Sequence, residues 1–449
     1  MKKQMNLLED AEGKLFIRYL IPGILGMMVL SAYVFVDALC IGRALGGNGI
    51  AALNVSTPVI TLFYATGFLF AAGGGASYSL YKGKGEDIKA RKMFTMAISC
   101  AAVVSIIYAI LGIVFIDQLA IALGATESNI QLTKEYLIAV LIFAPFFVID
   151  ILFNVFARND KAPKVAMNAT LVCCGLNVVL DILFVFGFNW GMGGAAFATA
   201  LSAVVSVSII GCYSFSKKSG LKLIKAKPTF EEFKKMIATG TSSFVNQLSV
   251  GIITILFNHT ILRLIGDSGV ATYGIIANMN LIFYSLFVGV ANAVQPIVSE
   301  NYGAGKIKRV HKFLRMGVIV TLCLGVISTI VCVAIPHSIA SIFVEDVELI
   351  KSTGDAMKIF GVAYLFMGIN ILADAYFYSV EKSAFAITVS LSRGLVTVAI
   401  VLFVMSKVLG ITGVWMTVTI AEFITAIISI VLYIKHNKVQ SIDAEKIAA

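Results

Sequence analysis

The sequence predicts an all-α integral membrane protein with twelve transmembrane helices in two pseudo-symmetric six-helix bundles. Two features of composition support this prediction: 59% of the residues are hydrophobic and 13% are charged. Ordinary globular proteins are about 45–50% apolar and about 25% charged. The third observation is that the apolar stretches approach or exceed the roughly 20 residues that a helix needs to cross a bilayer. The composition therefore excludes a soluble enzyme.

Twelve apolar stretches have the length of membrane-crossing helices. We place them at 15–41, 50–78, 93–116, 133–157, 163–188 and 192–214, and then at 234–264, 268–296, 313–336, 353–380, 384–407 and 410–434. They divide the chain into an N-terminal bundle at 1–214, a basic cytoplasmic linker at 215–233 and a C-terminal bundle at 234–449. The charged start and the length of the first apolar run argue against a cleavable signal peptide.

The second half of the chain repeats part of the first about 220 residues later. The recurring residues are Arg43, Gly46, Gly49, Phe63, Tyr64, Ser79, Gly83, Gly85 and Lys92, which correspond to Arg263, Gly266, Gly269, Phe283, Tyr284, Ser299, Gly303, Gly305 and Lys312. An even number of crossings gives both halves the same orientation. Two such bundles that rock around a shared binding site are a common transporter plan. The alternative is that fused repeats only build a stable bundle.

Basic residues concentrate on one side of the expected membrane. They lie at 2–18, 82–92, 158–164, 217–235, 306–315, 382 and 435–446, whereas the loops of the other side hold little more than Arg43, Lys134, Arg263, Lys351, Lys358 and Lys407. The positive-inside rule then places both termini in the cytoplasm. The excess of basic residues in the cytoplasmic loops therefore accounts for the net charge of +10, and we expect no nucleic-acid partner.

The sequence shows no motif for catalysis or nucleotide binding. The seven cysteines lie in or beside apolar spans and form no CxxC pair, so we interpret them as packing residues. The GAGK run at 303–306 lacks the first glycine and the final Ser or Thr of a phosphate-binding loop. An intramembrane enzyme would need a nucleophile–base pair or paired metal ligands, and neither is visible. We therefore expect no enzymatic activity, no cofactor and no ATP, so that uphill transport would draw on an ion gradient.

Two aspartates lie inside the expected N-terminal spans, where a carboxylate is costly and usually faces the bundle interior. Tyr33 precedes Asp37 by one helical turn and Asn177 precedes Asp181 by one turn, so each pair shares a helix face. Thr199 in the next span lies at the same level of the membrane. Such an oxygen-rich cluster suits a hard cation, or an aspartate that takes up a proton. A structural hydrogen-bond network between helices is the alternative.

The C-terminal half departs from this pattern. The span at 234–264 has no acidic residue, whereas Asp374, Arg393 and Glu422 lie in the last three spans. Asp374 either gates or binds substrate, or extends to the cytoplasmic rim. We expect Arg393 to pair with a carboxylate, and the sequence leaves both Asp374 and Glu422 open as its partner.

We expect a substrate cavity between the bundles, lined by apolar, aromatic and methionine side chains. The candidate lining residues are Met27, Met28, Phe63, Phe68, Phe70, Tyr284 and Phe287, together with Asp374 and Arg393. Aromatic faces attract organic cations, and flexible methionines accept ligands of varied shape. For any single apolar residue of this set, packing within a bundle or against lipid is the alternative.

Several runs of the chain resemble the multidrug and toxic compound extrusion (MATE) family of transporters. The run Tyr33–Gly42 is similar to the first-helix motif of the family, and Asn177–Gly187 with Gly193–Ala196 and Thr199 is similar to its helix 5–6 motif. Phe156–Arg158, Ala162–Pro163, Gln295–Pro296 and Asn301–Gly303 also fit the family pattern. The resemblance extends over the whole chain, and the helix 5–6 run is fairly specific.

The resemblance implies extrusion of drugs and cationic organic compounds by sodium or proton antiport. It places the coupling site at Tyr33, Asp37, Asn177, Asp181 and Thr199, with the last four as the ligands where the cation is Na⁺. Some members have a second acidic site in helices 7 and 10, and the missing helix 7 carboxylate argues against that site here. We also expect a monomer in the cell membrane, in contact with lipid and small-molecule substrates. The alternative is a flippase or exporter of a lipid-linked oligosaccharide or another lipid-like substrate, but a flippase for lipid-linked oligosaccharides would need a strongly cationic cavity.

Overall fold

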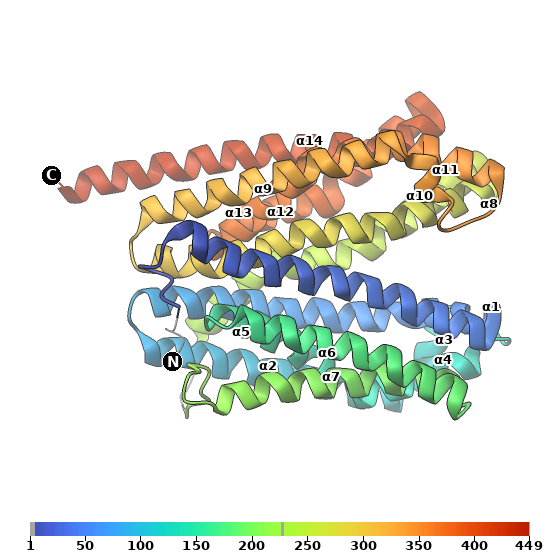
Figure 1. Cartoon of the computed structure of the whole chain (residues 1–449), viewed down its shortest axis with the longest axis horizontal. Helices are drawn as coiled ribbons and strands as arrows, with labels where there is room; N and C mark the ends of the chain where they lie inside the picture. The colour runs from blue at the N-terminus through green and yellow to red at the C-terminus, as the bar shows by residue number, and fades with distance from the viewer. Residues whose placement is uncertain (1–4, 226–228, 449) are drawn as a thin grey trace.

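The computed structural model describes residues 5–225 and 229–448, and it confirms an all-α protein built from two helical bundles (Figure 1). The bundle of α1–α7 and the bundle of α8–α14 lie side by side, and both termini lie at the same end of the molecule. Lys2, Lys3 and Lys227, which belong to the expected basic clusters, lie outside the described residues.

The first bundle contains α1 to α7 and the turn η1. Its elements are α1 (Glu12–Gly83), α2 (Asp87–Val114), the short α3 (Ile116–Ala122), α4 (Ile130–Ile142), α5 (Ala144–Asn159), α6 (Pro163–Asp181), the π-helical turn η1 (Ile182–Gly187) and α7 (Gly191–Phe215). Helices α4 and α5 together make one crossing with a bend of 55°. Pro145 and Pro163 stand in the first turns of α5 and α6, where a missing backbone N–H removes no helical hydrogen bond.

The second bundle contains the remaining elements. They are α8 (Phe230–Gly303), α9 (Ile307–Ala334), α10 (Pro336–Ala340), α11 (Val347–Phe360), the 3₁₀ turn η2 (Gly361–Ala363), α12 (Tyr364–Ser379), α13 (Ser383–Leu391), the π-helical turn η3 (Ser392–Val396) and α14 (Thr397–Ala448). Helix α8 begins inside the expected linker because Thr229 and Glu232 form a capping box. The Glu232 N–H donates to Thr229 Oγ1 at 3.3 Å, and the Thr229 N–H donates to Glu232 Oε2 at 2.8 Å.

Three of the long helices change direction at a glycine: α1 and α8 contain two crossings each, and α14 contains the end of the crossing that begins in α13 and the whole of the next. Gly46, Gly266 and Gly410 have φ angles of 64°, 73° and 58°, a left-handed region that glycine adopts without steric cost. The 72 residues of α1 would extend about 108 Å if straight, at about 1.5 Å per residue, whereas a bilayer core is about 30 Å thick. With both limbs counted, the described residues contain the twelve expected crossings.

The two bundles contact each other through glycines in α1 and α8. A Cβ atom on Gly83 would overlap the carbonyl oxygen of Glu300, and one on Gly303 would overlap that of Leu80. Each of these residues has its counterpart about 220 positions away in the other half, so the contact is pseudo-symmetric. In a membrane no hydrophobic effect drives helices together, because lipid is as apolar as the side chains. Small residues instead let the backbones approach closely, and van der Waals packing then stabilises the contact.

The junction between the bundles predicts an effect of Gly240→Ala. The new Cβ would lie against the backbone of Leu69 in α1, and overpacking of this kind costs about 1–3 kcal/mol. We expect a lower unfolding temperature for the purified protein in detergent. Gly251→Ala in the same limb of α8 is the control, because no atom lies within 4 Å of its Cβ position. Alanine favours a helix over glycine by about 1 kcal/mol, so this control should match or exceed the parent. Equal melting of the two variants would contradict the close contact.

Candidate functional site

The first bundle brings the expected polar residues of three helices into one buried cluster. Asp37 lies in α1, Asn177 and Asp181 lie one turn apart in α6, and Thr199 lies in α7. Their exposed fractions are 8% for Asp37, 1% for Asn177, 0% for Asp181 and 9% for Thr199. The Asn177 Nδ2 donates a hydrogen bond to Thr199 Oγ1 at 3.2 Å. The cluster therefore joins three helices inside the bundle.

Several oxygen atoms of this cluster lack the hydrogen bonds that burial normally requires. Among the described residues, Asp37 Oδ1, Asn177 Oδ1 and both carboxylate oxygens of Asp181 have no hydrogen-bond partner. The carboxyl groups of Asp37 and Asp181 lie close enough to repel each other when both are charged. Because an uncompensated buried charge is expensive, the arrangement favours uptake of a positive charge.

The donor set determines which positive charge could bind. Two carboxylates, an amide oxygen and a hydroxyl suit a proton or a hard cation that prefers oxygen ligands, such as Na⁺. Within residues 5–225 and 229–448, no three His, Cys, Asp or Glu side chains converge as a transition-metal site would require. Tyr33 lies half-buried beside the cluster, next to Asp37 and Tyr64, and adds a further hydroxyl on the α1 side.

The chain leaves regular α-helical geometry directly after Asp181. Residues Ile182–Gly187 form the π-helical turn η1, a rare conformation that is frequent at functional sites. The ring of Phe184 in this turn stacks on Trp190, with the ring centroids 4.9 Å apart. The aromatic stack follows the last regular turn of α6, so Asp181 stands at the point where the helix changes its winding.

In the second bundle, Arg393 pairs with Glu422, one of the two partners that the sequence left open. The Arg393 Nε donates to Glu422 Oε1 at 2.9 Å, and the two side chains are 12% and 5% exposed. The Asn370 Nδ2 donates to the other carboxylate oxygen at 2.7 Å. The guanidinium also lies over the ring of Tyr284, 5.3 Å from its centroid. Tyr284 of α8 and Glu422 of α14 thus hold Arg393 in place, and Asn370 of α12 holds Glu422.

Asp374 lies in the interior of the second bundle and does not extend to the rim. It is 7% exposed, and it accepts hydrogen bonds from Asn246 Nδ2 at 2.8 Å and Ser390 Oγ at 3.0 Å. Asn246 lies in the first limb of α8, within the span 234–264 where the sequence showed no carboxylate. The structure therefore excludes the rim interpretation of Asp374 in this conformation.

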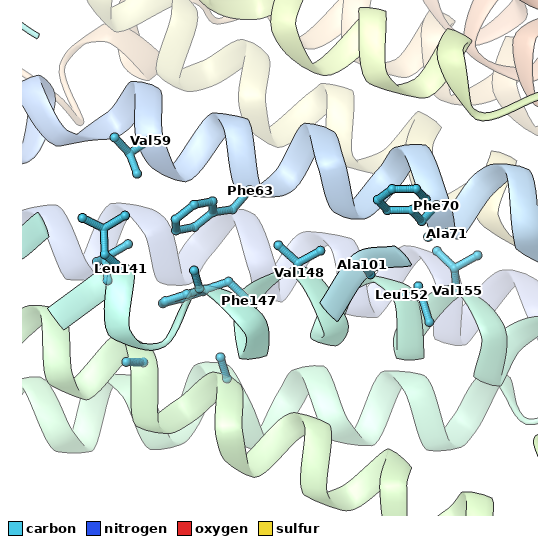
Figure 2. Packing of buried hydrophobic residues seen from close by; sticks show 14 of the residues in the cluster. Val59, Phe63, Phe70, Ala71, Ala101, Leu141, Phe147, Val148, Leu152 and Val155 are labelled. Carbon is cyan, nitrogen blue, oxygen red and sulfur yellow. The ribbon is translucent and has the colours of Figure 1, made fainter. Parts of the chain in front are cut away.

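Three of the expected cavity residues lie in hydrophobic cores in this structure. Phe63 and Phe70 are 1% and 4% exposed and pack on the α4–α5 crossing, with the Phe63 ring 6.3 Å from that of Phe147 (Figure 2). Phe287 is 0% exposed, and its ring lies 6.3 Å from that of Tyr364. These side chains face helices of their own bundle, so packing, the alternative stated above, describes them here.

The other apolar candidates keep part of their surface accessible. Met28 is 40% exposed, while Met27, Phe68 and Tyr284 are half-buried. Tyr284 has a defined neighbour in Arg393, as described above. These four side chains are therefore the members of the expected apolar set that could still contact a ligand.

Sequence analysis missed Asp150, a carboxylate in α5. Its Oδ1 accepts hydrogen bonds from Ser206 Oγ at 2.5 Å and from Asn154 Nδ2 at 3.0 Å. The signal was present, because Asp150 lies inside the apolar stretch 133–157 and meets the criterion that selected Asp37 and Asp181. The structure thus adds a third membrane-embedded carboxylate to the first bundle.

Sequence analysis also missed a group of polar contacts between the bundles, at the end that carries both termini. The side-chain amides of Asn159 and Gln295 donate to each other at 3.1 and 3.2 Å. Lys161 Nζ lies 2.9 Å from Glu300 Oε1, and the Glu300 side chain is 2% exposed. These contacts join α5 and its following turn to α8, so they must break if the bundles separate at this end.

Comparison with known proteins gives a consistent result at the level of sequence. The family model MatE matches residues 22–183 and 242–404, one match in each half of the chain. The multidrug export protein MepA of Staphylococcus aureus (strain NCTC 8325 / PS 47) is 26% identical over 433 residues. This similarity covers 95% of this chain and 94% of that protein.

Solved structures agree at the level of the fold. A multidrug resistance MATE family transporter of the MOP superfamily, in an outward-facing conformation, matches with a TM-score of 0.90 at 22% identity, over 96% of this chain and 98% of that chain. A MOP superfamily transporter from Pyrococcus furiosus matches with a TM-score of 0.89 at 22% identity, over the same shares of both chains. The two MatE matches cover more than half of the sequence, and together with the duplicated bundles they show that this chain belongs to the MatE family of membrane transporters.

Proposed function

We propose that this protein is a secondary antiporter that exports amphipathic, cationic organic compounds in exchange for Na⁺ or H⁺ by alternating access. The observation that carries the proposal is the buried pair of Asp37 and Asp181, in which Asp37 Oδ1 and both oxygens of Asp181 lack hydrogen-bond partners among the described residues. The similarity to MepA, a multidrug export protein, supports drugs as the substrate class.

The carboxylate pair suggests how an ion could drive transport. When both groups are charged, their repulsion and their burial raise the free energy of the bundle, and a bound cation or proton relieves both. Pro22, Gly23 and Gly26 give the first limb of α1 a place to bend when Asp37 is neutralised. Gly23 lies against the backbone of Gly289 in α8, so a shift of this limb would reach the junction between the bundles.

We further propose that the two bundles move as units around a substrate site between them. The Asn159–Gln295 and Lys161–Glu300 contacts would close the gate at the end that carries both termini. This end is assigned to the cytoplasm, because the basic loops gather there as the positive-inside rule requires. The protein would then act in the cell membrane, as a monomer, without ATP and without a nucleic-acid partner.

Substrate would contact the accessible members of the expected cavity set. Met27, Met28, Phe68 and Tyr284 offer methionine and aromatic surface, which suits cationic and variable ligands. Asp374 would attract the positive charge of the substrate. A flippase for lipid-linked pyrophosphates would need free cations in the cavity, and the engagement of Arg393 with Glu422 argues against that alternative.

The first functional prediction concerns the coupling site. We expect Asp181→Asn and Asp37→Asn to reduce gradient-driven dye transport in everted vesicles to the passive leak, because the amide keeps the volume but cannot take a proton or balance Na⁺. Asp117→Asn is the control, since Asp117 is 65% exposed and pairs with Lys134 outside the cluster. Sodium and pH gradients applied in turn would identify the coupling ion. Normal gradient-driven transport by both cluster variants would leave these aspartates a structural role.

The second prediction separates the two bundles. Because α8 lacks a carboxylate near Asp374, we expect Asp374→Asn to weaken dye binding or slow transport while the dependence on the ion gradient persists. Dye affinity and ion dependence, measured on the same preparation, check this expectation. Cation binding that survives the loss of Asp37 and Asp181 but disappears in Asp374→Asn would move the coupling site to the second bundle.

The third prediction concerns competition between ion and substrate. If the cation and a cationic substrate favour different positions of α1, each must weaken the other by the same factor, typically about 5–150-fold for linked sites. We expect dye affinity in nanodiscs to fall as the coupling cation, Na⁺ or H⁺, becomes more concentrated. A dye titration at several sodium concentrations and pH values measures this effect. Constant affinity across both series would rule out the linkage.

A further inference from the structure

The repeat of about 220 residues continues into the polar interiors of the two bundles. In the first bundle, Thr170 Oγ1 donates to Asn154 Oδ1 at 3.2 Å. In the second, Ser390 Oγ donates to Asp374 Oδ1 at 3.0 Å. Asn154 corresponds to Asp374 and Thr170 corresponds to Ser390, each about 220 positions later in the sequence. The hydrogen bond between the two helices is therefore itself duplicated. The two interiors can therefore be compared residue by residue.

One pair of equivalent positions carries different chemistry in the two bundles. Arg393 corresponds to Cys173, and its neighbour Tyr284 corresponds to Tyr64. The Arg393 guanidinium lies over the Tyr284 ring, and Cys173 likewise lies near Tyr64. The tyrosine is thus retained, but the second bundle has a fixed positive charge where the first has a neutral thiol.

The carboxylates of the ion cluster follow the opposite pattern. Asp37 and Asp181 of the first bundle correspond to Phe257 and Val401, which are 0% and 8% exposed in the second. The cluster that lacks an internal cation is therefore absent from the bundle that contains Arg393. The second bundle has Glu422 instead, on a different crossing: Glu422 follows the turn at Gly410 in α14, whereas Val401 precedes that turn and Phe257 lies in α8.

Glu422 also differs from Asp181 in how its oxygens are satisfied. Arg393 engages Oε1 and Asn370 engages Oε2, whereas neither oxygen of Asp181 has a hydrogen-bond partner among the described residues. A guanidinium stays charged at any physiological pH, so it compensates the carboxylate permanently. Because the charge of this buried carboxylate is already compensated, binding of a proton or Na⁺ would bring no further stabilisation.

We propose that Arg393 is a tethered cation: it occupies Glu422 permanently and so prevents this carboxylate from acting as a second exchangeable ion site. The proposal rests on the ion antiport proposed above, and it makes Arg393 a residue that sets how many cations bind per protein. Without the guanidinium, Glu422 would become an additional acceptor for Na⁺ or a proton. Among the described residues, the other charged or titratable groups found around the pair are Tyr284 of α8 and Asp374 of α12, the latter within electrostatic range of Arg393.

The test uses a background in which the first-bundle cluster is neutral, Asp37→Asn with Asp181→Asn. In this background, Arg393→Met should add about one bound cation per protein, because it leaves Glu422 buried without its partner. Binding of radioactive sodium to the full chain in nanodiscs, and proton uptake across a pH series in choline chloride, measure this gain. Both readouts are independent of substrate transport. Loss of ion binding in the background itself tests the first-bundle site separately, so failure of the two proposals can be told apart.

Matched variants identify the group responsible. Adding Glu422→Gln to Arg393→Met should abolish the gained cation, adding Asp374→Asn should preserve it, and Arg393→Lys should bind no additional cation. No gain in Arg393→Met, or a gain that survives Glu422→Gln, would overturn the proposal. If Arg393→Met folds poorly, we expect its yield of folded protein to recover at high Na⁺ or low pH. The double variant Arg393→Met with Glu422→Gln should fold without high Na⁺ and without low pH. Poor folding that no cation relieves would equally contradict the tethered-cation role.

Discussion

The absence of water from the bilayer interior is the constraint on which the rest of this structure depends. Backbone groups must find partners within the chain, so the described residues cross the membrane as helices, and the chain reverses at glycines such as Gly46 and Gly266 where left-handed backbone carries no steric cost. The same constraint applies to side chains, because a charge placed in such an interior needs a partner or must be neutralised.

The two bundles meet this requirement in different ways, although they descend from one repeated pattern. The second bundle compensates Glu422 with Arg393, which makes a closed and permanent ion pair. The first bundle leaves Asp37 and Asp181 with unpartnered oxygens, an arrangement that is unfavourable until a positive charge arrives. Binding of an external ion lowers the free energy of an uncompensated site, so it can be coupled to a conformational change. An ion pair that is already complete only holds helices together. This difference is why we assign coupling to the first bundle.

The sequence was sufficient for the architecture and for part of the polar cluster in the first bundle. Composition and span length predicted twelve crossings, and helical periodicity placed Asn177 and Asp181 on one face of α6, both of which the structure bears out. Both inferences depend on short-range geometry that a helix imposes on neighbouring residues. The same reasoning failed where a residue has several possible neighbours: Phe63 and Phe70 have cavity-like chemistry, yet they pack on the α4–α5 crossing.

By itself, the sequence determined the number of crossings, the duplication and the membrane-embedded charges, because each depends on residue type and spacing along the chain. Tertiary structure alone decided which of the polar and charged side chains meet. In the folded chain, Arg393 pairs with Glu422 and not with Asp374. Asn159 contacts Gln295 across the junction between the bundles, and Asp374 is enclosed within its own bundle. These contacts link residues on different helices, and their formation depends on how the helices rotate and pack, which no local spacing specifies.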